Sequence, residues 1–330
     1  MRLNMLAHCT AKGFKALAVT ATGMLMAAHA SDQDAGFEAR FAPLYATVFT
    51  EGGSFSGSAM SAELQTLEPL LKKPGVATRD IFLLYYTQAS VYGRRDMPAE
   101  AGKAALMALK ALPQPSDPDL EYAHFFLRYS SIRWLASAGL HEAALKQVKA
   151  FQTQYPLEEI AKLPAEMRWD ESVKPAQALD FPSQIQILGI YEDDGYVLHE
   201  QGNFREARQV NERLLPVAQE RLKALGKLQR IRGVLNNVAQ NCYELGDLKQ
   251  AEAYLRLRLQ IALSAQDHTT VYDSYFQLMV LAHEQKLDSQ ARQWLAHYEQ
   301  YAHTQNDAGQ QNRAQQLLAE LEQRTTGLYR

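Results

Sequence analysis

Histidine stands beside glutamate in two similar stretches of this sequence, at His199 in "VLHEQGNFREA" and at His283 in "LAHEQKLDSQA". On a helix, such a pair is half of a zinc-peptidase motif, which needs a second histidine four residues after the first so that both imidazoles face one metal ion. Those positions hold Asn203 and Leu287. We therefore expect no zinc site at either pair, and the duplication itself needs an explanation.

Other groups that could do chemistry are scattered along the chain. The run "EDD" at 192–194 concentrates carboxylates, which can act as general acids and bases, but helical faces often carry such charges. Trp169 is followed by Asp170 and Glu171 inside a proline-containing stretch. Cys242 falls at an apolar position and is typical of a buried small side chain. We predict no catalytic residue, no metal ligand and no cofactor.

The two histidine stretches belong to a longer internal repeat. Aligning "GNFREARQVNERLL", "GDLKQAEAYLRLRL" and "KLDSQARQWLAHYE" places Ala207, Ala251 and Ala291 in register. Two weaker copies upstream, "DMPAEAGKAALMAL" and "GLHEAALKQVKAF", place Ala101 and Ala144 in the same role. Successive copies are mostly 40 to 44 residues apart. Self-similarity at such a period is the sequence signature of a repeat architecture.

Three further columns test the repeat independently of the alanines. Twelve and nine residues before each alanine, small or apolar side chains dominate. These two columns hold Ala89, Ile132, Gly195, Ala239 and Met279, and then Tyr92, Leu135, Leu198, Cys242 and Ala282. Five residues before each alanine stand Asp96, Gly139, Gly202, Gly246 and Lys286. Glycine at this place is typical of a helix that ends in a left-handed turn, so each copy predicts helix, tight turn, helix.

On these residues the chain resembles the tetratricopeptide repeat family. The segments 191–215 and 235–259 carry the family's spacing of apolar, small, aromatic, glycine and alanine positions, and weaker copies extend the resemblance over most of 80–300. The resemblance implies an all-α, right-handed helical solenoid of about five or more helix-turn-helix repeats with an irregular insertion. An irregular helical bundle is the alternative architecture.

The amino end has the pattern of a secretory signal. A basic start without acids leads into a 13-residue apolar run, Ala16–Ala28, and "AHA" at 28–30 is a small-residue cleavage site. The run is too short to span a bilayer, which needs roughly 20 residues. We expect cleavage after Ala30 and a periplasmic or secreted protein without a transmembrane span, and a retained anchor stays open as the alternative.

The remaining chain divides by pattern into five segments. Four prolines interrupt 152–184, so that segment cannot be one helix. The divisions are 1–30 signal peptide, 31–79 amino-terminal helical and loop segment, 80–151 degenerate repeats, 152–184 insertion, 185–303 repeats, and 304–330 capping helix and tail, the helix at about 312–324. A polar-faced terminal helix shields the last apolar surface of a solenoid.

Charge and resemblance together indicate the class of partner. The whole chain has a formal net charge of −3, and the first thirty residues hold three cations and no acid, so the rest is more acidic still. Nucleic-acid binding rests on dense positive charge and is not expected. By resemblance to the family, the faces of successive first helices line a concave groove that holds a peptide, and we expect a protein or peptide partner in the cell envelope.

The predicted groove residues follow from the helical period, since positions 15, 14, 11, 8 and 7 before each alanine share one face. They include Tyr86, Tyr129, Arg133, Glu192, Tyr196, His199, Asn236, Asn237, Gln240, Tyr243 and His283. Amides can bond a peptide backbone through donor and acceptor, and tyrosines add rigid apolar area. Some family members clamp a terminal carboxylate with lysine and asparagine, but Glu192 and Tyr196 stand where that clamp would be. The acids favour a neutral or partly basic ligand.

Two classes of function remain open. The first is a non-catalytic interaction scaffold that binds its partner in the groove. The second is an enzyme or a small-ligand receptor whose site the 152–184 insertion, with Trp169, Asp170 and Glu171, forms against the groove. We favour the scaffold because no nucleophile, metal set or phosphate loop is found, although a solvated polar face would explain the same residues.

Overall fold

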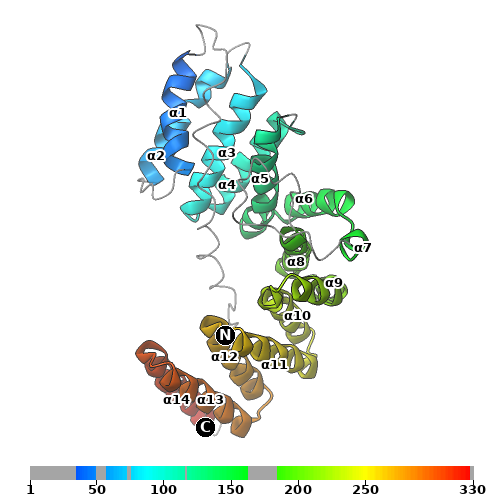
Figure 1. The fold of residues 1–330 in the computed structure, drawn as a ribbon. Coiled ribbons are helices and arrows are strands. Elements are labelled where there is room, and N and C mark those ends of the chain that lie inside the picture. The colour runs from blue at the N-terminus through cyan, green and yellow to red at the C-terminus, as the bar shows by residue number, and fades with distance from the viewer. Residues whose placement is uncertain (1–34, 50–56, 73–75, 116, 163–183, 328–330) are drawn as a thin grey trace. The chain divides into compact units, whose positions relative to one another are not determined.

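The computed structural model describes residues 35–49, 57–72, 76–115, 117–162 and 184–327 (Figure 1). Every regular element within these ranges is a helix, so the predicted all-α class is confirmed. The contacts divide the chain into two compact units, unit 1 with residues 1–150 and 169–183, and unit 2 with residues 151–168 and 184–330. The predicted signal peptide, and residues 163–183 of the predicted insertion with Trp169, Asp170 and Glu171, lie outside the described residues.

Unit 1 is built from helices that pack on their neighbours in the chain. α3 contacts α4, α4 contacts α5, and both α1 and α2 contact α3. α6 crosses the division between the units. The elements are α1 (Ala35–Phe49), α2 (Gly57–Gln65), η1 (Glu68–Lys72), α3 (Thr78–Arg94), α4 (Pro98–Ala111), α5 (Pro118–Ser137) and α6 (His141–Gln154).

An aromatic stack joins α1 to α3 in the core of unit 1. Four rings spaced four residues apart on α1, from Phe37 to Phe49, lie on one face because that spacing only slightly exceeds one helical turn. Phe49 stacks on Tyr86 of α3 with ring centroids 4.9 Å apart. Tyr86 in turn stacks on Phe82 and meets the edge of Phe126. The first helix is therefore held by aromatic packing, although this segment matches no copy of the repeat.

Unit 2 continues as consecutive antiparallel neighbours from α8 to α14, each packed on the next. Long helices account for the long period, since α9 has 21 residues and α11 and α13 have 17 each. The elements are α7 (Leu157–Ile160), α8 (Gln184–Glu200), α9 (Phe204–Ala224), η3 (Leu228–Ile231), α10 (Arg232–Glu244), α11 (Leu248–Ser264), α12 (His268–Glu284), α13 (Asp288–Thr304) and α14 (Ala308–Gly327).

The repeat columns are buried in every copy. The five aligned alanines are at most 1% exposed, and the columns twelve and nine residues earlier are also buried throughout. Gly195 shows why some of these residues must be small. A Cβ atom there would overlap the side chain of Asn211 on α9, so glycine lets α8 and α9 approach closely. Cys242 is fully buried as predicted, and burial raises the pKa of its thiol to about 11.

The turns between paired helices have one geometry in all five copies. Asp96, Gly139, Gly202, Gly246 and Lys286 all have positive φ, between 55° and 77°. In each turn, the backbone amide of the residue that follows donates to the carbonyl of the residue nine positions before the aligned alanine, which we call the anchor alanine of its copy. Asp247 donates in this way to Cys242 at 2.8 Å, and Leu287 donates to Ala282 at 2.9 Å. This is the Schellman ending, which satisfies carbonyls at a helix terminus. Asp96 and Lys286 adopt it without glycine's freedom.

The last helix presents one apolar stripe to α13. Ala314, Leu317 and Leu321 are buried, and most of the residues between them are exposed. α14 begins at Ala308, earlier than the predicted 312, because the Asp307 side chain accepts from the Gln310 amide at 3.1 Å and caps the first turn. No helix among the described residues is long and apolar enough to cross a membrane.

Candidate binding surface

The first helices of the unit 2 repeats, α8, α10 and α12, are joined by side-chain contacts along one face. Nδ1 of His199 on α8 lies 2.7 Å from Oδ1 of Asn241 on α10. Gln277 on α12 donates to Oδ1 of Asn236 on α10 at 3.1 Å. Tyr243 is hydrogen-bonded to Glu284, and burial together with this bond raises its pKa to about 12. We call the side chains that stand 15, 14, 11, 8 and 7 residues before the aligned alanines, on α8, α10 and α12, the first-helix face of unit 2.

Glycine also allows α8 and α10 to approach closely. A Cβ atom at position 233 would overlap the carboxylate of Glu192, so the absence of a side chain on Gly233 makes room for that predicted groove residue. Tyr196 lies one turn further along α8 and is half-buried. Both side chains make further contacts within the molecule.

Two amides on α10 make no side-chain hydrogen bond to another described residue. Asn237 is half-buried, and Gln240 is only 8% exposed. These two side chains are therefore the members of the predicted set that are best suited to bond a ligand.

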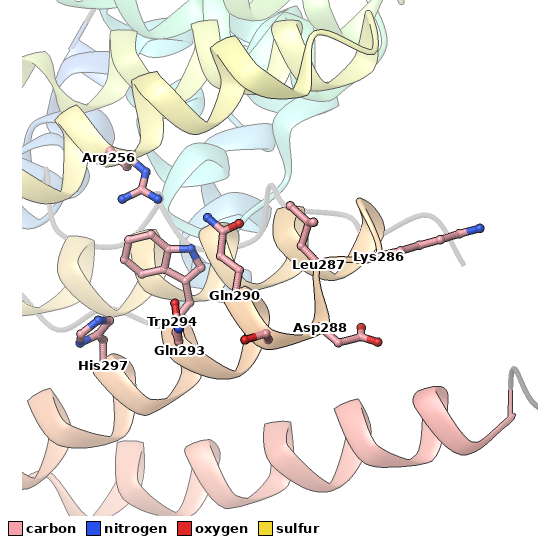
Figure 2. Close-up of a pocket in the computed structure, with 9 residues that line it drawn as sticks. Arg256, Lys286, Leu287, Asp288, Gln290, Gln293, Trp294 and His297 are labelled. Carbon is pink, nitrogen blue, oxygen red and sulfur yellow. The ribbon is translucent and has the colours of Figure 1, made fainter.

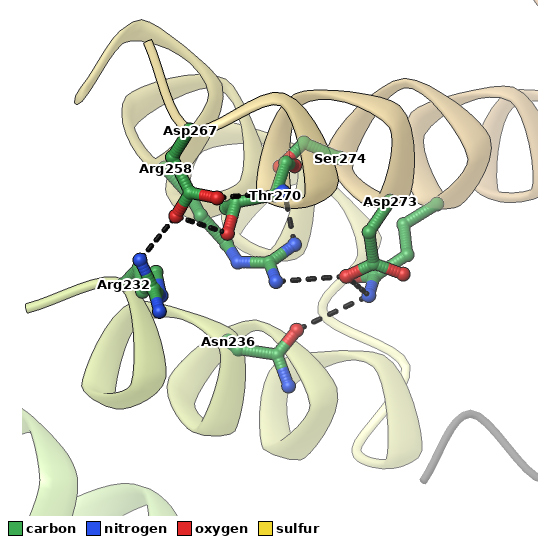
Figure 3. Close-up of polar contacts among 8 residues, drawn as sticks. Arg232, Asn236, Arg258, Asp267, Thr270, Asp273 and Ser274 are labelled. Carbon is green, nitrogen blue, oxygen red and sulfur yellow. Dashed lines mark hydrogen bonds and ion pairs between the residues drawn. The ribbon is translucent and has the colours of Figure 1, made fainter. Parts of the chain in front are cut away.

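A buried arginine supports the face from below, as Figure 3 shows. Arg258 comes from the second helix α11, its side chain is 7% exposed, and it pairs with Asp273 on α12 at 2.7 Å. It also donates to Ser274 at 3.1 Å. Asp273 accepts in addition from Gln277 at 3.0 Å, which links the pair to Asn236. The network fixes α12 relative to both α10 and α11.

A second polar group in Figure 3 fixes the start of α12. Asp267 accepts from the Thr270 amide at 3.3 Å and from its hydroxyl at 2.8 Å, which is an N-cap. Arg232, at the start of α10, pairs with the same carboxylate. The register of α12 against α10 is thus held at two points.

The predicted groove residues of unit 1 have a different environment. Tyr86 is 5% exposed because of its stacking on Phe49 and Phe82, so it takes part in packing there. Tyr129 on α5 is half-buried and stacks on Phe125 with centroids 6.5 Å apart. Arg133 is exposed.

His199 and His283, the histidines of the two histidine-glutamate pairs, contact other side chains of the protein. His199 also meets the edge of the Phe204 ring at 5.0 Å, and Nδ1 of His283 lies 3.3 Å from Oδ1 of Asp288. Within the described ranges, no three histidine, cysteine, aspartate or glutamate side chains are grouped so that they could hold a metal ion.

Sequence patterns did not indicate a pocket between α11 and α13, shown in Figure 2. Its volume is about 590 Å³, and its lining includes Trp294, Gln290 and the exposed Leu287. The guanidinium of Arg256 lies over the Trp294 ring, 4.6 Å from its centroid. Glu252 holds Arg256 in place and accepts from Gln290 at 3.0 Å. The sequence does place Trp294 one helical turn after Gln290, so both side chains share a face of α13. Only the tertiary structure shows that this face lies against α11.

Comparison with known proteins supports the fold without naming a family. No family model matches the chain, and no curated protein matches it. Among solved structures, RapI in its apo form is similar, with a TM-score of 0.58 at 13% sequence identity over 86% of this chain and 70% of RapI. RapI is a helical-repeat protein. At this identity the likeness concerns the fold alone, and this chain has a tetratricopeptide-like helical-repeat fold.

Proposed function

We propose that this protein is a non-catalytic interaction scaffold that binds an extended segment of a partner protein on the first-helix face of unit 2. The observation that carries the proposal is the pair of unbonded amides, Asn237 and Gln240, on a helix whose other amides, Asn236 and Asn241, are bonded to neighbouring first helices. Amide side chains of this kind can both donate to and accept from a peptide backbone. Tyr196 and Tyr243 beside them offer rigid area with a polar tip.

The proposed location is the bacterial periplasm or the outside of the cell, and the partner is a protein of the cell envelope. This part of the proposal rests on the signal-like pattern of residues 1–30. Fractionation of cells that produce the full chain with a carboxy-terminal tag tests it. A cleaved product in the periplasmic or extracellular fraction is expected, and an uncleaved product in the cytoplasm would contradict the export.

The binding face is tested by crosslinking in cells followed by purification of the tagged chain. One variant carries Tyr196→Ala, Asn237→Ala and Gln240→Ala. Its matched control carries Gln209→Ala, Gln219→Ala and Gln260→Ala, three exposed amides on the second helices α9 and α11. Circular dichroism and thermal unfolding establish that both variants are folded.

The expected result is an envelope protein that crosslinks to wild type and to the control but not to the face variant. Reconstitution of that complex from purified components then gives the affinity directly. The face variant is expected to bind roughly tens of times more weakly than wild type, because a few central residues usually contribute most of the binding energy of an interface. Equal recovery with all three chains would exclude this face as the contact surface.

A further inference from the structure

The three first helices of unit 2 all end on a glutamate. Glu200, Glu244 and Glu284 are the last residues of α8, α10 and α12, each seven residues before the anchor alanine of its copy. A helix carries partial negative charge at its carboxy terminus, so an anionic side chain there is unfavourable. Repetition of an unfavourable placement in three successive copies calls for a reason other than stability.

The three carboxylates form no ion pair with a lysine or arginine of the described residues. Glu244 and Glu284 are exposed, Glu200 is half-buried, and Glu284 is bonded to the Tyr243 hydroxyl. Unit 1 differs at the same register, where α3 ends on Arg94, which suits the helix dipole, and α5 ends on Ser137. The acidic ends are thus a property of unit 2.

A second and independent feature lies beside them. Gln240 is more than nine-tenths buried, has no side-chain hydrogen bond to another described residue, and stands four residues before Glu244. Residues at that spacing are neighbours on one helix face. An unbonded amide next to a row of unpaired carboxylates is suited to a ligand that offers both peptide groups and cations.

The spacing of the row limits the shape of that ligand. α8 packs on α10, and α12 reaches α10 through side chains, since Gln277 donates to Asn236 at 3.1 Å. Helices in such contact lie on the order of 10 Å apart. A polyproline II segment rises about 3.1 Å per residue with three residues per turn, so every third side chain points the same way at intervals of about 9 Å. We therefore expect one turn of such a segment to span about the step from one first helix to the next.

We propose that the acidic helix ends of unit 2 recognise a partner segment in extended, polyproline-like conformation that carries lysine or arginine at every third residue. This inference deepens the proposed function and rests on it, since it names the chemistry of the segment that the first-helix face binds. Each cation faces one of the carboxylates at positions 200, 244 and 284. The amides of Asn237 and Gln240 bond the backbone between them.

The test uses two fluorescent peptides of identical composition and charge, with three lysines each among prolines and alanines. One has lysine at positions 1, 4 and 7, and the other has its lysines adjacent. Fluorescence anisotropy with the full chain at low ionic strength measures both affinities. We expect the spaced peptide to bind at least about fivefold tighter, and salt to weaken its binding because the charges are exposed.

The first variant carries Glu200→Gln, Glu244→Gln and Glu284→Gln. Its control carries Glu206→Gln, Glu220→Gln and Glu320→Gln, three exposed acids on second helices and on α14 with the same change in net charge. Each removed carboxylate is expected to weaken binding of the spaced peptide about two- to fivefold, so the triple variant should lose at least about eightfold in affinity. The control changes the affinity by less than about twofold.

Thermal unfolding of the first variant separates loss of binding from misfolding, since removing anions from helix carboxy termini is expected to raise its thermal midpoint. Equal affinity of wild type for both peptides, or equal losses in variant and control, would overturn the inference. If that occurs while the Tyr196, Asn237 and Gln240 variant still loses the natural partner, the proposed function stands without this specificity. If that variant also keeps the partner, both proposals fail.

Discussion

Helix α3 of unit 1 and helix α10 of unit 2 occupy the same place in the repeat, yet their corresponding faces differ in what packs against them. On α3 the face is covered by α1 and α2, and Tyr86 is stacked inside it. The hydroxyls of Thr87 and Ser90 on this face bond their own helix, Thr87 to the Leu83 carbonyl at 2.8 Å and Ser90 to the Tyr86 carbonyl at 2.9 Å. On α10 the equivalent positions hold Asn236 and Asn237, which project no apolar surface to cover.

The comparison teaches that a repeat register specifies which face a residue occupies but not what lies against that face. An aromatic ring at the position recruits another helix, because burying it is favourable by about 1.5–3 kcal/mol or more. An amide at the same position recruits no apolar helix, and Asn236 instead accepts a hydrogen bond from Gln277 of the next copy, because burying an amide without a bond is costly.

The largest expected effect comes from truncating the covered face. Tyr86→Ala removes a ring from the stack of Phe49, Phe82 and Phe126, and we expect a loss of about 3–5 kcal/mol in the free energy of unfolding. Asn236→Ala at the equivalent position of α10 should cost less than about 1 kcal/mol. Urea unfolding followed by circular dichroism measures both. Similar losses would remove the distinction between the two faces.

A pH dependence should also distinguish unit 1. His124 is 7% exposed, and burial lowers its pKa to about 4 from an ordinary value near 6.5. The unfolded chain therefore takes up the proton first, and stability is complete above pH 6.5 and is lost as the pH falls toward 4. The loss reaches up to about 3 kcal/mol, since one pKa unit corresponds to about 1.36 kcal/mol.

Urea unfolding of wild type and His124→Gln at pH 7, 5.5 and 4.5 measures this contribution. The unfolding free energy of wild type should fall more than that of the variant as the pH falls. A difference that does not change with pH would show that His124 contributes nothing to acid sensitivity.

Close packing inside unit 2 gives an effect of intermediate size. Gly195→Ala places a methyl group against Asn211, and overpacking of this kind costs about 1–3 kcal/mol. Gly309→Ala in α14 is the control, because a methyl group there meets only Asp307 at 3.4 Å. Thermal unfolding should show a lowered midpoint for the first substitution and an unchanged or raised midpoint for the second, because alanine is favoured over glycine in a helix. An unchanged midpoint at Gly195 would mean that α8 and α9 can separate at little cost.

The smallest effects are expected at the turns. Lys286→Gly should stabilise unit 2 by about 1 kcal/mol, because a side chain in the left-handed region costs roughly that much. Gly246→Ala, in the same turn of the preceding copy, should destabilise it by a similar amount. Chemical unfolding of both variants measures the pair. Changes of the same sign would contradict a common turn geometry.

Part of the candidate surface was predictable from the sequence, because the helical period places Asn237, Gln240 and Tyr243 on one face with His199 and His283. The period does not reveal partners across helices. It did not show that Asn236 is bonded to Gln277, that Tyr86 is covered by an aromatic ring, or that Arg258 reaches Asp273. Each of these depends on which segments meet, and hence on tertiary packing.

The amino-acid sequence alone determined the helical class, the four repeat columns and the position of each turn, because these follow from local spacing and from glycine's access to left-handed backbone. Even Asp96 and Lys286 adopt the turn that their neighbours in register predict. The tertiary structure alone decided which copies expose their first-helix face and which bury it. That outcome depends on whether a distant segment, here the aromatic stripe of α1, finds an apolar surface to cover.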